Sequence, residues 1–393
     1  LNIGLSAPTG KATARLKEAL NDKKNISSSK YLDQIEFQTL HRWILNSQNK
    51  SLKLKFKLKE LDIFIIDEMS MVNIDLIESV LNLLAKDCKI ILVGDKNQLS
   101  PVNNCSIWNY LFEYSDNSSI KSCVVNLEKT YRNIGDIALI SSLIFNNDFS
   151  LLNQKIKELE KDNNSKEITI SKSREKDIPK DLLFSITSHL KQLNISTSNL
   201  SKKKYIFDES IDNLLLNEKD LVDKIFLDLQ SHLILCEKNS GIWSVEYLNE
   251  IVFGQKKPYD LKTLKEGVPI MCTKNNNELG LSNGDIGVLI GLKNKRKYLF
   301  RKFNDNNEEI VALIDPSNLE NVVPAIAITI HKSQGSESEK VNILWAQNYR
   351  RNQYAVKEKK DNQNIFCRDN FERRLFYTAV TRAKKSLNIY YLN

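Results

Sequence analysis

Residues 63–70 read Ile-Phe-Ile-Ile-Asp-Glu-Met-Ser and are the clearest structural signal in the chain. Its four consecutive apolar residues predict a buried strand, because a strand covered on both faces has no polar side with which to alternate. Two carboxylates, Asp67 and Glu68, follow the strand directly. A second apolar run, residues 90–93, comes about one helix later and ends in a Gly-Asp pair. Strand, helix and strand in this order indicate a parallel sheet covered by helices.

The same alternation extends outward along the chain. Residues 2–5 predict a strand before a helix around residues 11–20, and a further helix is expected over residues 74–85. Strand-like runs return at residues 325–330, 341–345 and 387–392. Residues 262–321 are β-rich with turn signals and predict a small barrel-like insertion. Residues 151–221 are polar and rich in Lys, Asn and Ser, and no site is assigned to them.

The polar residues after the apolar runs are the candidates for chemistry, because open α/β sheets bind ligands at the carboxyl ends of their strands. Asp67 would hold Mg²⁺, directly or through water, and Glu68 would position and deprotonate the water that attacks a phosphoryl group. A lone Asp-Glu pair also fits a buried strand that ends in a solvated acidic turn. Gln98 follows the second run within G-D-K-N-Q-L-S-P-V, and its amide can contact a γ-phosphate. The two runs at helix-length spacing favour nucleotide chemistry.

Composition sets wider limits. The 393 residues are 41% hydrophobic and 27% charged, which is typical of a globular protein. The net charge of +8 (57 minus 49) suits a polyanionic partner, although abundant Lys and Asn also fit an A/T-rich genome. The six cysteines form no Cys-x-x-Cys pair and are interpreted as reduced thiols of a cytoplasmic protein. No apolar run reaches the roughly 18 residues that span a bilayer, so no membrane role is expected. The first residue is Leu1, which is typical of the middle of a longer protein.

The motifs and their order resemble superfamily 1 DNA helicases, and among these the RecD-like helicases, the alpha subunits of exodeoxyribonuclease V. Residues 327–337, Ala-Ile-Thr-Ile-His-Lys-Ser-Gln-Gly-Ser-Glu, are nearly identical to the T-x-H-K-S-Q-G-S-E run of that family. Residues 377–385, Tyr-Thr-Ala-Val-Thr-Arg-Ala-Lys-Lys, resemble its T-A-V-T-R-A motif. Residues 279–287 resemble an element of its SH3-like domain. The resemblance covers nearly the whole chain except residues 151–221.

The resemblance implies an α/β fold with two RecA-like parallel-sheet domains and a small SH3-like β insertion in the second. The first domain would span residues 1–125 and lack its first strand and P-loop. The second would comprise residues 126–261 and 322–393, with the insertion at residues 262–321. In the family, the two domains close on ATP and step 5′ to 3′ along single-stranded DNA.

The resemblance also implies which residues meet the nucleotide. Gln98 becomes the γ-phosphate sensor, and Arg132, in the Tyr-Arg pair at residues 131–132, becomes an arginine that reaches the γ-phosphate. Arg382 becomes a second arginine finger, although a helix with a basic solvated edge would have the same composition. Gly335 and Glu337 would face the nucleotide.

Residues 6–13, Ser-Ala-Pro-Thr-Gly-Lys-Ala-Thr, are not a Walker A loop. The pattern G-x-x-x-x-G-K-[ST] requires glycine where Leu5 stands and a hydroxyl where Ala12 stands. The segment resembles the A-P-T-G-K-A loop that contacts single-stranded DNA in the family, and a plain strand-to-helix turn is the alternative. The DNA-contacting residues implied by the resemblance are Pro8, Thr9, Lys11, Thr329, His331 and Lys332. Trp43, in a T-L-H-R-W run, fits a core position at least as well as a stacking one.

The implied cofactors are ATP and Mg²⁺, and the implied partners are single-stranded DNA, duplex ends and the RecB and RecC subunits of a heterotrimer that acts in double-strand break repair and recombination. Without the glycine loop, this chain alone should bind ATP poorly, hydrolyse it negligibly and be unstable at an uncovered sheet edge. Either the gene is truncated or decayed, or the missing part is supplied separately. A non-catalytic DNA-binding or complex-stabilising subunit and a standalone RecD-like or relaxase-linked helicase remain alternatives.

Overall fold

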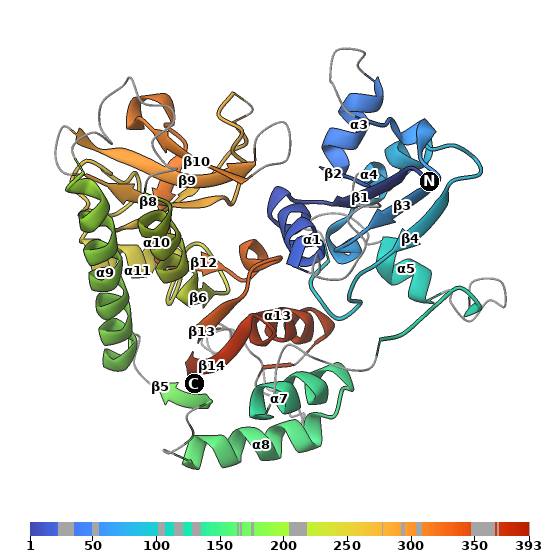
Figure 1. The fold of residues 1–393 in the computed structure, drawn as a ribbon. Helices are drawn as coiled ribbons and strands as arrows, with labels where there is room; N and C mark the ends of the chain where they lie inside the picture. Colours follow the sequence, from blue (N-terminus) through green and yellow to red (C-terminus); the bar gives the residue numbers. More distant parts are fainter. Residues whose placement is uncertain are drawn as a thin grey trace. The chain divides into compact units, whose positions relative to one another are not determined.

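A computed structural model describes the chain except residues 23–34, 49–54, 101–106, 114–120, 128–134, 163–164, 166, 174–176, 204–217, 277, 292–294, 304–308, 347–365, 368 and 393. The chain divides into two compact units, one within Leu1–Lys129 and one within Thr130–Lys302 and Glu309–Asn393 (Figure 1). Each unit contains a parallel sheet, which confirms the predicted α/β class. The exact domain boundaries stay predictions. No helix in the described ranges is long and apolar enough to cross a membrane.

The sheet of the first unit has four parallel strands in the order β2-β1-β3-β4. In chain order the elements are β1 (Ile3–Ala7), α1 (Gly10–Asp22), β2 (Ile35–Thr39), α3 (Leu40–Gln48), η2 (Leu58–Glu60), β3 (Ile63–Ile66), η3 (Met69–Met71), α4 (Ile74–Leu81), β4 (Lys89–Leu92) and α5 (Ile107–Glu113). Because all four strands are parallel, the segments that follow β1, β3 and β4 emerge at one edge of the sheet.

The core of this unit forms around Trp43, whose side chain is fully buried. Its ring meets the Phe64 ring edge to face at 5.6 Å between centroids, and its Nε1 donates to the Leu5 carbonyl at 3.3 Å. A Cβ on Gly4 would lie 2.6 Å from Leu61 Cδ1, so only glycine fits beneath these side chains. Trp43 is therefore a core residue, which was one of the two roles predicted for it.

Strand β4 lies at an edge of this sheet. Among the described residues no strand pairs with its outer side, and Ile90, Ile91 and Val93 expose 38%, 48% and 40% of their surface. Ile90 and Ile91 point to opposite faces, because side chains alternate along a strand. Both faces of β4 are therefore partly uncovered, and an apolar strand edge of this kind pairs readily with other chains.

We expect Ile91→Lys to reduce self-association of the chain, because a charge on an exposed edge strand opposes edge-to-edge pairing. Size-exclusion chromatography with light scattering would show a larger monomer fraction and less aggregate than for the unmodified chain. Leu151→Lys is the matched control, since Leu151 is equally exposed but lies on a helix whose backbone is already hydrogen-bonded. Equal gains from both substitutions would show that general hydrophobicity, rather than the edge of β4, drives association.

The second unit has a five-stranded parallel sheet in the order β12-β6-β13-β14-β5. The elements that build its α/β part are α7 (Gly135–Phe145), α8 (Phe149–Lys161), β5 (Ile168–Ser173), α9 (Lys180–Ser201), α10 (Lys219–Ser231), β6 (His232–Cys236), α11 (Val245–Phe253), β12 (Ile328–Thr329), η8 (His331–Ser333), β13 (Ser338–Trp345), α13 (Asn370–Val380) and β14 (Ala383–Leu392). Residues 151–221, to which the sequence assigned no site, thus contribute most of α8, the strand β5 and the 22-residue helix α9.

Helices cover both faces of this sheet, as its apolar strands require. Leu344 of β13 packs in a core with Leu182 of α9. The next residue, Trp345, meets Phe376 of α13 at 5.3 Å between ring centroids. Successive residues of one strand therefore contact helices on opposite sides, and only the ends of the sheet remain open for a ligand.

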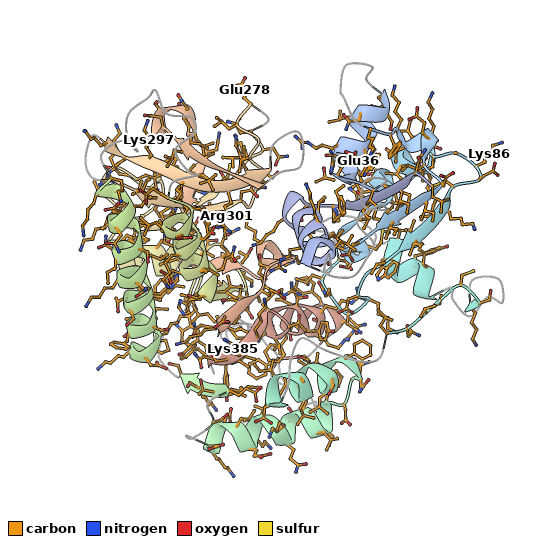
Figure 2. All side chains as sticks on the ribbon, in the orientation of Figure 1. Glu36, Lys86, Glu278, Lys297, Arg301 and Lys385 are labelled. Carbon is orange, nitrogen blue, oxygen red and sulfur yellow. The ribbon has the colours of Figure 1, made fainter. Side chains whose placement is uncertain are left out.

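The predicted β-rich insertion is an antiparallel sheet in the order β10-β9-β8-β7-β11. Its strands are β7 (Pro269–Cys272), β8 (Ile286–Ile290), β9 (Lys297–Phe303), β10 (Glu309–Ile314) and β11 (Val322–Pro324). Leu289 of β8 faces the insertion's own core, while Val288 and Ile290 pack against α9 and α10. Arg301 of β9, labelled in Figure 2, pairs with Asp223 of α10 and lies over the Phe226 ring at 4.5 Å. The sheet is therefore docked on these helices, and its SH3-like character stays a prediction.

Candidate functional site

The carboxyl edge of the first sheet brings together three segments that the sequence singled out. The amide of Asp67 donates to the Ser6 carbonyl at 2.8 Å, which ties the end of β3 to the end of β1. The amide of Met69 donates to the Val93 carbonyl at 3.0 Å, which ties the same turn to the end of β4. These bonds fix the Asp-Glu turn between its two neighbouring strands.

Asp67 and Glu68 form a tight turn. The Glu68 amide donates to Asp67 Oδ1 at 2.8 Å, and Glu68 has left-handed backbone angles, φ 53° and ψ 43°. A non-glycine residue in this conformation stores strain, and such residues cluster at functional sites. Both side chains are half-buried, and the chain continues directly into η3, whose Met69 and Ser70 are buried. The carboxylates are therefore held at the sheet edge by a rigid support.

Gln98 lies in the turn that follows β4. Asp95 organises this turn by accepting hydrogen bonds from the Asn97 amide at its Oδ1, 2.9 Å, and from the Gln98 amide at its carbonyl, 3.2 Å. Gly94 begins the turn, and a Cβ there would lie 3.1 Å from the Met69 amide nitrogen. The turns after β3 and β4 therefore touch through their backbones.

Several buried polar atoms at this edge have no hydrogen-bond partner among the described residues. They are Ser6 Oγ, Gln38 Oε1, Ser70 Oγ and Gln98 Oε1. Ser6 stands opposite Gln38 in the register of β1 and β2. A buried polar group without a partner costs about 1–3 kcal/mol, so such groups mark places where water or a polar ligand binds. Sequence reasoning named only Gln98 of this set.

The predicted DNA-contacting residues between β1 and the start of α1, which are Pro8, Thr9 and Lys11, have a partly structural role. Thr9 Oγ1 accepts a hydrogen bond from the Ala12 amide at 3.2 Å, and its carbonyl accepts one from the Thr13 amide at 3.1 Å, so Thr9 caps α1. Pro8 is half-buried and Lys11 is exposed. This geometry fits the alternative of a strand-to-helix turn. Of the three residues, Lys11 is the one that carries a positive charge, and its side chain is exposed. Their contact with DNA stays a prediction.

The loop after β12 in the second unit is built by its own hydroxyl groups. Thr329 Oγ1 accepts from the Lys332 amide at 3.4 Å, and Ser333 Oγ donates to the Ile330 carbonyl at 2.7 Å. Gly335 has φ +68°, a conformation that favours glycine, and lets the chain turn back into β13. The compact T-x-H-K-S-Q-G sequence therefore encodes a self-supported loop at the carboxyl end of β12.

His331 and Lys332 of this loop are both half-buried. Burial lowers the pKa of His331 below its ordinary value, so its ring is neutral near pH 7. Burial, and then the charge of Lys257, lowers the pKa of Lys332. Lys332 Nζ lies 4.0 Å from Met271 Sδ and pairs with no carboxylate among the described residues. A partly buried cation without a counter-ion is suited to bind an anion such as phosphate.

Glu337 and Arg382 are both engaged within the second unit. Glu337 Oε1 lies 2.8 Å from Lys384 Nζ. Arg382 is 2% exposed, and its guanidinium donates to the Thr378 carbonyl at 3.0 Å, the Ser336 carbonyl at 3.1 Å and Thr381 Oγ1 at 3.2 Å. Arg382 thus joins the end of α13 to the loop after β12. A solvated basic edge is excluded for Arg382, and its contact with a γ-phosphate stays a prediction.

Replacing Arg382 with Ala should lower the free energy of unfolding by about 2–4 kcal/mol, because two enclosed carbonyl groups lose charged donors. Urea denaturation followed by circular dichroism would measure the change. Lys385→Ala is the control, because Lys385 is exposed (Figure 2), pairs with Glu339 at the surface, and should change stability by less than about 0.5 kcal/mol. Unchanged stability of the Arg382 variant would mean that the guanidinium is not held as described.

The structure adds a loop that sequence reasoning missed, residues 237–244 between β6 and α11. Thr329 pairs with Cys236 in the register of β12 and β6, so this loop begins beside the loop after β12. The Val245 and Glu246 amides donate to the carbonyls of Lys238 and Asn239. The signal was present in the sequence, since a polar run follows the apolar run 233–236.

Two further predictions concern residues or ions that the structure does not place. Arg132 lies outside the described residues. Among the described residues there is no group of three or more His, Cys, Asp or Glu side chains that could hold a metal ion alone. A carboxylate at Asp67 fits Mg²⁺, which keeps several waters and shares phosphate oxygens rather than requiring an all-protein cage.

Two family models match the ends of the chain. Residues 1–104 match a model described as an AAA domain, and residues 291–393 match the UvrD-like helicase C-terminal domain. The first match contains the turns after β1, β3 and β4, and the second contains the loop after β12 and Arg382.

Relatives of known annotation match nearly the whole chain. It is 31% identical to the RecBCD enzyme subunit RecD of Buchnera aphidicola subsp. Schizaphis graminum and 28% identical to that of Buchnera aphidicola subsp. Acyrthosiphon pisum, over 99% of this chain in each case. It is 26% identical to RecD of Haemophilus influenzae. The chain spans just under two thirds of these relatives, 65%, 64% and 62% of their lengths.

A solved structure of Bacteroides Pif1 bound to ssDNA is a more distant likeness, with 16% identity, a TM-score of 0.45, and coverage of 99% of this chain and 88% of that one. The AAA match, the UvrD-like helicase C-terminal match and the RecD relatives agree with the resemblance drawn from the sequence motifs. The chain is therefore similar over nearly its whole length to RecD subunits, and its C-terminal part matches the UvrD-like helicase C-terminal domain.

Proposed function

We propose that this chain is the motor part of an ATP-dependent 5′ to 3′ DNA helicase, a subunit of an exodeoxyribonuclease V complex that acts in double-strand break repair and recombination in the cytoplasm. The observation that carries this proposal is the edge of the first sheet, where the Asp67-Glu68 turn is hydrogen-bonded between the ends of β1 and β4. Gln98, with its buried and unpaired Oε1, follows β4 at the same edge. Two carboxylates and an amide acceptor there fit Mg²⁺ and the terminal phosphate of ATP.

Each of these side chains has a distinct chemical task in the proposal. Bound Mg²⁺ and ATP supply the metal charge and the phosphoryl group. Asp67 Oδ1 already accepts a hydrogen bond from the Glu68 amide. Asp67 would therefore hold the metal through its other carboxylate oxygen, directly or by way of a water molecule. Glu68 would take the proton from the attacking water, and Gln98 would orient that water. Arg132 and Arg382 would neutralise charge on the phosphate, which for Arg382 requires release from the Ser336 carbonyl.

The loop after β12 is the proposed DNA contact in the second unit. Lys332 offers a half-buried charge to a phosphate, and His331 offers a neutral ring. The hydroxyl of Thr329 is already engaged with the Lys332 amide, so Thr329 would act mainly by shaping the loop. Backbone contacts of this kind fix position without reading sequence, as a translocating motor requires. Pro8, Thr9 and Lys11 would contact the strand from the first unit.

The chain contains no G-x-x-x-x-G-K-[ST] sequence, so we infer that it hydrolyses ATP negligibly by itself. A longer form that includes such a loop on the N-terminal side would be the active one. Its proposed partners are RecB and RecC, because the curated relatives are named as subunits of RecBCD. Its proposed substrates are single-stranded DNA and duplex ends.

A second candidate function is a DNA-binding or complex-stabilising subunit that does not hydrolyse ATP. The enclosure of Arg382 favours it, because a side chain held by three groups of its own unit is less available to a nucleotide. A standalone RecD-like helicase would have the same motifs and would differ in its independence from partner subunits.

Unwinding polarity tests the proposal. The longer form should open duplexes with a 5′ single-stranded tail in the presence of ATP and Mg²⁺, and should leave duplexes with a 3′ tail intact. A fluorescence strand-displacement assay on the two substrates would measure both rates. Opening only from 3′ tails would contradict the proposed direction, and opening of neither would favour the non-catalytic subunit.

A further inference from the structure

An aromatic ring stands exposed next to the proposed DNA loop. Phe371, in the first turn of α13, exposes 54% of its surface. Its ring centroid lies 6.1 Å from that of His331, and the two ring planes differ by 30°. Phe371 therefore extends an aromatic surface from the loop after β12 onto a second element, at a position that sequence reasoning did not single out.

The packing of α13 does not require an aromatic residue at this position. The apolar side chains that the helix buries are further along it, at Leu375, Phe376, Ala379 and Val380. Phe366 stacks on Phe376 with centroids 4.5 Å apart and planes within 7°, and Phe371 is not part of this stacked pair. An apolar ring exposed to water is unfavourable, and among the described residues the one ring that Phe371 contacts is that of His331 in the proposed DNA loop.

The charges around Phe371 indicate what it can bind. Asp369, two residues earlier, caps α13 by accepting from the Glu372 amide at 2.8 Å, so a carboxylate lies close to the ring along the chain. The exposed ring of Phe371 itself carries no charge, so it suits the face of a nucleobase rather than a phosphate. The cation next to His331 is Lys332, which suits the phosphate of the same strand. A phosphate would thus bind at Lys332 and a base of the same strand at Phe371.

We propose that Phe371 is a nucleobase-stacking residue of the single-stranded DNA path, braced by His331 and adjacent to the phosphate contact at Lys332. The proposal rests on the DNA-binding function proposed above. Stacking on an aromatic ring tolerates every base, because each base has a π face, and it is worth enough to hold one base in place. A motor that moves along any sequence needs this kind of contact.

The experiment separates base contacts from phosphate contacts. Fluorescence anisotropy would measure the affinity of the 393-residue chain for a thymidine oligonucleotide of about a dozen residues and for an all-abasic strand with the same number of phosphates. The unmodified chain should bind the thymidine strand more tightly. Phe371→Ala should weaken thymidine binding about 5- to 100-fold and change abasic binding less than about 2-fold. Phe371→Trp should restore the preference for bases.

Two controls make the outcomes distinguishable. Phe184 of α9 is 73% exposed, and Phe184→Ala should leave both affinities unchanged. Lys332→Ala should weaken both strands alike and reduce the slope of log affinity against log salt by about 0.7. Equal losses on both strands for Phe371→Ala, or no loss on either, would overturn the stacking role while leaving the DNA function standing. No binding by the unmodified chain, or no effect of Lys332→Ala, would overturn the proposed DNA contact itself.

Discussion

Glu68→Gln should lower DNA-stimulated ATP hydrolysis by the longer form of the protein about 100- to 1000-fold while leaving ATP binding nearly unchanged. A positioned general base contributes about 10²- to 10⁴-fold, and glutamine keeps the size of glutamate without its ability to accept a proton. The left-handed backbone of Glu68 and the bond from its amide to Asp67 should persist, because the side chain alone changes. The expected loss is therefore in kcat rather than in nucleotide affinity.

The measurement is a coupled ATPase assay at saturating single-stranded DNA, together with the binding of a fluorescent ATP analogue. Glu78→Gln on α4 is the matched control, since Glu78 is an exposed glutamate of the same unit, and it should retain full activity. An unchanged kcat for Glu68→Gln would mean that another group takes the proton. A parallel loss of nucleotide binding would point to a metal or structural role for Glu68.

The second unit should lose stability steeply as the pH falls from about 6.5 to about 4. Burial lowers the pKa of His189 to about 4, and burial, His189 and Lys340 lower that of His232 to about 3. Histidines in an unfolded chain have a pKa near 6.5. Between this pH and the lowered pKa of the native histidines, the unfolded chain binds protons that the native protein does not bind. With both histidines contributing, the free energy of unfolding should fall by up to about 2.5 kcal/mol per pH unit. Above about pH 6.5 the effect is absent.

A polar network that crosses the second sheet includes His232 and adds to the effect of burial on this residue. His232 Nε2 lies 3.2 Å from Ser185 Oγ and 2.5 Å from Asn342 Nδ2. The Asn342 amide nitrogen is a donor only, so a proton on His232 Nε2 would place two donors against each other. Asn342 in turn accepts from Asn388 at 2.8 Å, and Asn388 accepts from Thr169 Oγ1 at 2.6 Å. The rings of His189 and His232 meet at 4.9 Å. Protonation therefore disturbs a chain of bonds that joins four strands.

Urea unfolding at a series of pH values between 4 and 7 would measure this dependence. Replacing His189 with Asn should roughly halve the slope, because only His232 then resists protonation. Asp228, whose carboxylate partly offsets the burial of His189, is unchanged in this variant. A flat stability curve between pH 6.5 and 4.5 would contradict the assigned neutral histidines.

Local patterns predicted the parts of the fold that depend on short stretches of chain. The apolar run 63–66 and the carboxylates after it became β3 and its turn, and the β-rich zone became an antiparallel sheet. Strand β5 could not be read in the same way, because Ile168-Thr-Ile-Ser-Lys-Ser is stabilised by pairing with Leu387 and its neighbours, more than 200 residues away. Such pairing leaves little trace in local periodicity.

The same distinction, between features set by short stretches of chain and features set by distant packing, applies to the candidate site. Motif order predicted Asp67, Glu68, Gln98 and the loop after β12, all of which lie in turns or loops that come after strands. The burial of Arg382 against the Ser336 carbonyl and the approach of Phe371 to His331 depend on how α13 packs. Neither contact could be predicted from the spacing of these residues in the sequence. The capping role of Thr9 was foreseen only as the alternative of a strand-to-helix turn.

The proposed helicase motor is tested by comparing ATP hydrolysis, with and without single-stranded DNA, by this chain and by the form extended on its N-terminal side through a G-x-x-G-x-G-K-T loop. The proposal predicts DNA-stimulated hydrolysis by the extended form and none above background by the 393-residue chain, because the first carries the phosphate loop and the second carries only the carboxylate turn and Gln98. Equal hydrolysis by both forms would contradict the assignment of residues 6–13 as something other than the ATP-binding loop. No hydrolysis by either would contradict the helicase motor itself.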